Sequence, residues 1–146
     1  MFLDSLVFKA KTDFNSLHGF SHWRSVYKNG LKISQDVDKT VLFYFSVFHD
    51  FFRVYEYTDS EHGKRASEII SKQALDLTDS QMEVLSFALT HHDLEPEEYN
   101  ELKDPLKDDI NVRTCIDSDR LDLGRVGIQP LVEYMLTDGA KRILNS

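Results

Sequence analysis

The stretch from Val41 to Phe52 constrains this chain most, because it is almost continuously apolar and aromatic. A helix that is apolar on nearly all sides is buried in a core and does not lie on a surface. Near its end, this stretch places His49 beside Asp50. Buried His and Asp side chains are tolerated when they are paired, hydrogen-bonded or bound to a metal. The sequence therefore predicts that other polar residues meet this pair inside the core.

The other long apolar segments recur at three- and four-residue steps, and no convincing alternating strand interrupts them. This periodicity predicts an all-α protein. The chain has 146 residues, enough for one domain with a real core and too few for two ordinary ones. We therefore expect residues 1–146 to form a single domain.

Charge and composition disfavour several classes of function. The formal net charge of −8 argues against binding of duplex nucleic acid through a basic face. No apolar run reaches the length of a membrane span. The single cysteine, Cys115, excludes an intramolecular disulfide and fits a reducing compartment. These features predict a cytoplasmic protein with no membrane and no nucleic-acid duplex as a partner.

Periodicity and capping residues predict where the helices begin and end. Asp38 and Ser60 are expected to cap two of them, and Thr78 with Gln81 matches a capping box. The expected helices cover 1–8, 19–35, 39–50, 60–74, 78–93, a segment that starts at 105, and 131–136. Residues 94–104 are expected to form a solvated loop, and residues 140–146 a frayed end.

All six histidines fall at the inner faces or the ends of predicted helices: His18, His22, His49, His62, His91 and His92. Imidazole nitrogen and carboxylate oxygen are ligands that suit Fe, Mn, Co or Zn. The single cysteine excludes a thiolate site. This distribution indicates a buried metal site and argues against a set of unrelated core histidines.

The order of His22, the doublet His49-Asp50 and then Asp119 resembles the HD superfamily of metal-dependent phosphohydrolases, over about residues 19–127. In that family the three parts come from separate helices of a bundle and bind one metal. Residues 117–122, Asp-Ser-Asp-Arg-Leu-Asp, resemble the Asp-Ala-Asp-Arg-Leu-Asp form of small HD proteins, in which the second Asp is the ligand. The resemblance implies an HD-domain helical bundle.

The same resemblance implies a second metal ion. In HD proteins with two metals, extra histidines lie between the doublet and the final Asp, where this chain has His62 and then His91 or His92. Asp50 would then bridge both ions. The step His91-His92 also resembles the cyclic-dinucleotide phosphodiesterase branch, although the Gly-Tyr-Pro signature of that branch is missing. That branch can hold a third metal and has a Glu where this chain has His18, so His18 is either a ligand or a capping or packing residue.

The expected cofactors are one or two divalent metal ions from among Fe, Mn, Co, Zn, Ni and Mg. Two adjacent cations lower the pKa of a bridging water and spread the charge on phosphate oxygens. Asp50 and Arg53 are the expected catalytic residues. Cations near the ligands are expected to bind the phosphate of the substrate: Arg53, Lys64, Arg65 and Arg120. Asp93 or Asp122 is expected to orient a ligand or shuttle a proton.

These features predict a metal-dependent phosphohydrolase that cleaves a small phosphate ester, such as a nucleotide or related metabolite, through metal-activated hydroxide. An HD-like di-iron oxygenase with the same ligands is one alternative. A non-catalytic sensor that binds a nucleotide or a metal is the other. The acidic composition favours a small-molecule substrate over duplex nucleic acid. A homodimer is left open.

Overall fold

The computed structural model describes residues 16–55 and 58–146, and every regular element within them is a helix. The α-helices are α2 (Phe20–Ile33), α3 (Lys39–Phe48), α4 (His62–Ile70), α5 (Asp79–His91), α6 (Pro96–Glu101), α7 (Ile110–Arg120) and α8 (Asp138–Leu144). Three short 3₁₀ turns are η1 (Pro105–Asp108), η2 (Leu123–Val126) and η3 (Val132–Tyr134). The all-α prediction is confirmed. The helix expected over residues 1–8 lies outside the described residues.

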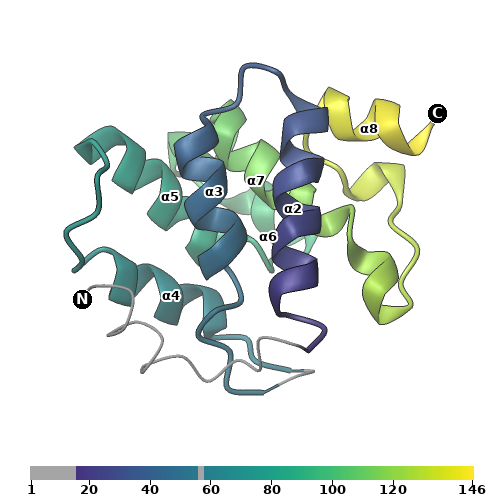
Figure 1. Ribbon diagram of the computed structural model, residues 1–146. Coiled ribbons are helices and arrows are strands. Elements are labelled where there is room, and N and C mark those ends of the chain that lie inside the picture. The colour runs from purple at the N-terminus through teal and green to yellow at the C-terminus, as the bar shows by residue number, and fades with distance from the viewer. Residues whose placement is uncertain (1–15, 56–57) are drawn as a thin grey trace.

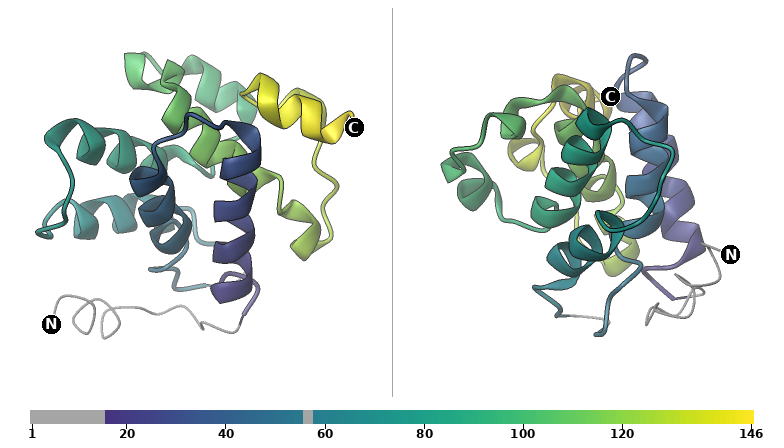
Figure 2. Two further views of the ribbon diagram at one scale, coloured as in Figure 1. Left: turned by 45° about the horizontal axis from the view of Figure 1, so that its top comes forward. Right: turned by 90° about the vertical axis from the view of Figure 1, so that its left-hand side faces the viewer.

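Helices α2 and α3 pack against each other in front of α5 and α7 (Figure 1). The turned views show α4 along α5, and α8 against α2 and α7 at the opposite end (Figure 2). The core between these helices consists of fully buried aromatic and aliphatic side chains, including Val26, Leu42, Phe45, Leu85 and Ile116. In the described part of the chain, no helix has both the length and the apolar character needed to cross a membrane.

Helices α3 and α5 are both capped by side chains, and their starts are linked to each other. Asp38 accepts hydrogen bonds from the backbone N–H groups of Thr40 and Val41, and so caps α3 as predicted. The Thr78–Gln81 capping box at the start of α5 is also confirmed. The Gln81 side chain then donates to the Asp38 carboxylate at 2.9 Å, which joins the two helix starts. At the other ends, the C-cap residues of α3 and α5 are His49 and His92.

Other boundaries differ from the prediction. Ser60 does not cap α4, because this helix begins at His62 after Glu61, without a side-chain cap. The expected loop 94–104 contains α6, which begins with Pro96 and buries Tyr99 completely. One apolar side chain in six residues is too few to show a helical period, so the sequence did not predict this helix. The buried Tyr99 hydroxyl donates a hydrogen bond to the carbonyl of Lys107 at 2.7 Å.

The C-terminal prediction was also wrong in two places. The helix expected over 131–136 is reduced to the short turn η3. The end expected to fray forms α8, because Thr137 caps it and Ala140 is buried beside Ile33 and Met135. The buried Asp117 carboxylate anchors this segment by accepting from the N–H of Leu136 and from the N–H and hydroxyl of Thr137.

Gly63 lets α4 approach α5 closely. A Cβ atom at this position would overlap the backbone carbonyl oxygen of Leu89 and lie 3.0 Å from the His92 ring. A backbone oxygen within a helix cannot turn aside as a flexible side chain can, so any larger residue would separate the two helices. Gly63 therefore allows the adjacent His62 to reach His92.

We expect Gly63→Ala to lower the free energy of unfolding by about 1–3 kcal/mol, since the added methyl group overpacks the α4–α5 contact. Chemical denaturation would measure this change. Gly124→Ala is the matched control, because nothing lies within 4 Å of its added Cβ, and its effect should stay within about 0.5 kcal/mol. Equal effects of the two variants would contradict the close helix approach.

Candidate metal centre

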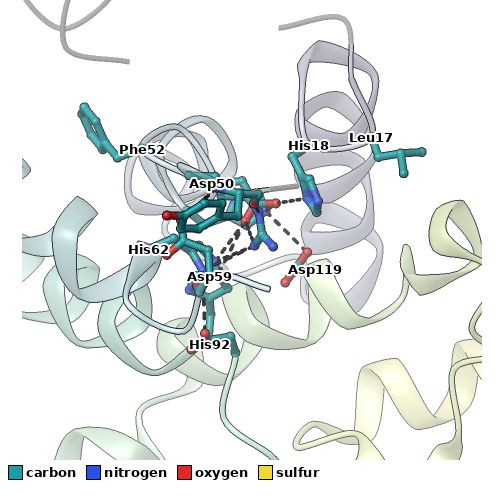
Figure 3. A network of polar contacts seen from close by, with 12 residues as sticks. Leu17, His18, Asp50, Phe52, Asp59, His62, His92 and Asp119 are labelled. Carbon is teal, nitrogen blue, oxygen red and sulfur yellow. Dashed lines mark hydrogen bonds and ion pairs between the residues drawn. The ribbon is translucent and has the colours of Figure 1, made fainter. Parts of the chain in front are cut away.

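Six of the predicted ligands come together in two groups that share Asp50. The first group is His22, His49, Asp50 and Asp119, and the second is Asp50, His62 and His92. Within each group the donor atoms all lie within 4.8 Å of one another. Figure 3 shows Asp50 at the centre of this network, with Asp119 approaching it from α7 and His62 and His92 lying beyond it.

The ends of five helices place these side chains. His22 lies in the first turn of α2, His49 is the C-cap residue of α3, and Asp50 follows it in a turn. Asp119 lies in the last turn of α7. In the second group, His62 is the first residue of α4 and His92 is the C-cap residue of α5. A helix end is a natural place for such groups, because a side chain there can reach past the apolar core.

The donor atoms of the first group face one another at short range. The Nε2 atoms of His22 and His49 are 2.8 Å apart. They lie 3.4 and 3.3 Å from Asp50 Oδ2, and 3.0 and 3.4 Å from Asp119 Oδ1. Two ligand atoms at about 2.1 Å from one metal ion and at right angles to each other would be about 3 Å apart. The spacing of the first group fits a single ion.

The second group uses the other oxygen of Asp50. Oδ1 lies 3.1 Å from His62 Nε2 and 4.0 Å from His92 Nε2, and the two Nε2 atoms are 2.9 Å apart. The Asp50 carboxylate is only 3% exposed. One oxygen of Asp50 therefore belongs to each group, which is the arrangement of a bridging carboxylate.

Each histidine in the cluster donates its Nδ1–H to an acceptor outside it. His22 donates to the Asp122 carboxylate at 2.7 Å. The other three donate to backbone carbonyls: His49 to Phe45 and Ser46, His62 to Asp59, and His92 to Leu89. These bonds put the proton of each neutral imidazole on Nδ1 and leave the Nε2 lone pair directed inward, as in histidines that ligate metals.

With neutral imidazoles, the donor atoms of the cluster carry no positive charge to balance the two carboxylates. Neutral imidazoles would place four lone pairs next to two carboxylates, and atoms of like partial charge repel at these distances. Asp119 Oδ1 is buried and has no hydrogen-bond partner of acceptable geometry in the described part of the chain. A divalent cation in each group would balance these charges, so the donor set fits one or two ions of the kind that bind nitrogen and oxygen.

The carboxylates alter the protonation of the first group. Burial opposes a charge on His22, but the nearby carboxylates of Asp119, Asp122 and Asp50 outweigh it and raise the pKa of His22 to about 10. Burial also opposes a charge on His49, and the attraction of Asp50 and Asp119 raises its pKa to about 9. Because the two Nε2 atoms are 2.8 Å apart, only one of them can hold a proton between them.

His92 in the second group behaves differently. Burial, followed by the nearby His62 and His49, lowers the pKa of His92 to about 3. This histidine is therefore neutral at pH 7, which is the form that binds a metal.

We expect the binding of Mn²⁺ or Zn²⁺ to displace about one proton from the His22–His49 pair at pH 7. Because the raised pKa values keep that proton bound well above neutral pH, apparent affinity should rise about tenfold per pH unit between about pH 6 and pH 8. Calorimetry in buffers with different ionisation enthalpies would count the released proton. An affinity that does not change with pH would contradict this picture.

The structure separates His92 from His91. His92 lies in the second group, whereas His91 donates from Nδ1 to the carbonyl of Phe87 at 2.9 Å and packs on the Phe87 ring. His91 also lines a different cavity, near η1. Consecutive residues on a helix point about 100° apart, so only one of the two can face Asp50. The structure does not bring His91, which was predicted as a ligand, into the cluster.

We expect His92→Ala to lower the amount of bound metal per chain, since it removes one of the three ligands of the second group. His91→Ala is a matched control, one residue away and outside the cluster, and should bind as much metal as the wild type. Elemental analysis of both purified variants would test the assignment. It would be overturned if His91→Ala lost metal and His92→Ala did not.

Only one of the four predicted phosphate-binding cations lies at the cluster. Arg53 Nη1 is 3.3 Å from Asp50 Oδ1 and 3.3 Å from both ring nitrogens of His62. Lys64 is exposed, with no contact to the cluster in the described structure. Arg65 pairs with Asp59 and donates to the Phe52 carbonyl.

Arg120 is also used elsewhere. It is buried and donates to the carbonyls of Tyr134 and Leu94. Arg65 and Arg120 thus hold the backbone around the site, and the prediction that they bind substrate has no support from their contacts.

The pairing of Arg65 with Asp59 has a role in the site. The buried Asp59 carboxylate also accepts from the N–H groups of Val54 and Tyr55. Burial opposes its charge, but Arg65 and these N–H groups lower the pKa of Asp59 to about 2. These bonds tie the backbone at residues 54 and 55, next to Arg53, to Asp59, whose own carbonyl accepts from His62.

Four further residues lie within 4 Å of the cluster. His18 precedes α2 and lies with Nδ1 3.0 Å from Asp50 Oδ2, so it is a neighbour of the first group (Figure 3). Asp122 orients His22, one of the two roles expected for it. Asp93 lies 3.7 Å from His62 Nδ1. Arg125 was not predicted from the sequence, yet its Nη2 atom lies 3.8 Å from both Asp50 Oδ2 and Asp119 Oδ1.

No family model matches this chain, and comparisons with curated proteins and with solved structures gave no match. The candidate metal centre is therefore supported by its own contacts, burial and charges.

Proposed function

We propose that this chain is a metal-dependent phosphohydrolase of the HD type that cleaves a small phosphate ester, such as a nucleotide or a related metabolite. One observation carries the proposal: the two ligand groups share Asp50 through separate oxygens, and a guanidinium group lies beside them. Arg53 Nη1 is 3.3 Å from Asp50 Oδ1. Paired divalent cations with an adjacent arginine suit the several negative oxygens of a phosphate ester.

Different residues of the cluster would have different roles in such a reaction. His22, His49 and Asp119 would hold one ion, and His62 and His92 the other, while Asp50 would hold both. Divalent ions bound there would supply Lewis acidity and make a coordinated water more acidic. Arg53 would donate to phosphate oxygens and offset the charge that develops on them. Asp122 would keep His22 in the tautomer that binds metal.

The cavities beside the cluster favour a small substrate. One cavity of about 440 Å³ includes His22 and Asp122 in its wall. Another of about 290 Å³ includes His92, Asp93 and Asp119. Volumes of a few hundred Å³ suit a metabolite-sized ligand. Arg53 also favours phosphate chemistry over the di-iron oxygenase alternative, because activation of oxygen requires no fixed cation beside the ligands.

We expect the metal-loaded protein to release phosphate from a panel of phosphate monoesters, and Asp50→Asn to lower kcat/KM by more than about a hundredfold, because it weakens both metal groups. Phosphate release with and without a chelator would measure this. Asp36→Asn, at an exposed position, is the control and should match the wild type.

Oxygen uptake should be measured in the same reactions. A chain that consumes oxygen and releases no phosphate would contradict the proposal in favour of the oxygenase. A chain that binds metal and turns over nothing would contradict it in favour of the sensor.

A further inference from the structure

Two backbone carbonyls fix the guanidinium group of Arg125. Arg125 lies in η2, and its Nε donates to the carbonyl of Leu17 at 3.0 Å. Its Nη1 donates to the carbonyl of Asp122 at 3.0 Å. A planar guanidinium held at two of its three nitrogens cannot rotate, so the direction of the third nitrogen is set. This residue is thus preorganised before any ligand binds.

The third nitrogen faces the first ligand group without bonding to it. Nη2 lies 3.8 Å from Asp50 Oδ2 and 3.8 Å from Asp119 Oδ1. These separations exceed hydrogen-bonding distance, although they allow attraction between the charges. Nη2 has no hydrogen-bond acceptor within the described structure. A donor in this position can bind an oxygen atom that enters beside the two carboxylates.

A polar cavity leads to this nitrogen. It has a volume of about 440 Å³ and is lined by Ser16, Leu17, Ser21, His22, Ser25, Asp122 and Arg125. Three of these residues carry a hydroxyl group, and Arg125 is the cation among them. The Asp122 carboxylate accepts from His22, and this hydrogen bond offsets part of its repulsion of an entering anion. The lining thus suits a phosphate group.

We propose that Arg125 is a substrate-binding residue, which donates from Nη2 to a phosphate oxygen that enters through this serine-lined cavity. The inference rests on the proposed phosphohydrolase function. It places two arginines on different oxygens of Asp50, with Arg53 beside Oδ1 and Arg125 beside Oδ2. A phosphate held at both ligand groups would then be bound by a cation at each end of the shared carboxylate.

The alternative is that Arg125 only ties the backbone at residue 17 to the backbone at residue 122. Arg113 provides a matched control for this role, because its Nε and Nη1 also donate to backbone carbonyls, those of Lys107 and Leu136. The third nitrogen of Arg113 is bonded to Asp108, which belongs to neither ligand group. If Arg125 only links two backbone segments, Arg125→Gln and Arg113→Gln should have similar effects on phosphate binding.

The test is calorimetric binding of inorganic phosphate to the metal-loaded protein. Arg125→Gln should weaken phosphate binding at least about tenfold, as expected for the loss of one charge-assisted hydrogen bond. Arg125→Lys should lie between the wild type and Arg125→Gln, because it keeps the charge and loses the planar fork. Arg113→Gln should stay within about twofold of the wild type. The metal content of all variants should be unchanged.

A second variant tests the cavity without altering the arginine. Ser21 is exposed and lines the cavity, so Ser21→Phe should fill the entrance, preserve the fold and weaken phosphate binding several-fold. This variant decides the question if Arg125→Gln does not fold.

Phosphate affinities within about twofold of the wild type in both Arg125→Lys and Ser21→Phe would overturn the role of Arg125. The proposed function would still stand if the wild type hydrolysed esters. A wild type that binds neither metal nor phosphate would overturn both proposals.

Discussion

The structure depends on the burial of one carboxylate, that of Asp50. Removal of a carboxylate from water costs several kcal/mol unless nearby groups compensate for it. Burial of Asp50 opposes its charge, but the attraction of His49 and hydrogen bonds from His18 and His22 keep its pKa well below the usual range. These groups come from the start of α2 and the end of α3, while Arg53 and His62, the first residue of α4, lie beside the other oxygen. The requirement to satisfy a single buried charge therefore constrains how the starts of α2 and α4 are placed relative to the end of α3.

The apolar core and the polar cluster are built on the same helices. Phe45, one turn before His49 on α3, stacks on the His49 ring and makes an edge contact with the His92 ring. The carbonyl of Phe45 also accepts from His49 Nδ1. This aromatic residue thus excludes water from the ligands and orients one of them. The long apolar run that contains it serves the site as well as the stability of the fold.

The sequence predicted which residues would cluster better than it predicted their surroundings. His22, His49 and Asp50 could be located because each falls at a helix end or on the inner face of a helix, whereas Asp119 was chosen over Asp117 and Asp122 through the resemblance to HD proteins. The choice between His91 and His92 could not be made, because it depends on where α5 ends. Arg65 and Arg120 lie on helices, but the carbonyls that they bond, such as those of Phe52 and Leu94, lie in irregular segments that have no period. Both arginines were therefore predicted to bind substrate. Arg125 was missed for the same reason, although its spacing after Asp122 repeats that of Arg53 after Asp50. Tyr99 lies in α6, a segment with too few apolar residues for a helix to be recognised, and α8 is only seven residues long, which is too short to show a period.

The link between Asp38 and Gln81 has a consequence for how the length of this chain can vary. It joins the starts of α3 and α5, while the ends of these helices place His49 in one ligand group and His92 in the other. One residue inserted into α3 would turn His49 by about 100° and move it about 1.5 Å along the helix, and no change of rotamer would restore its position. Residues 39–48 and 79–91 can therefore tolerate substitutions on their outer faces, whereas their number of residues is fixed. Insertions should be confined to the connections between helices, with the tight turn that carries Asp50 as the exception.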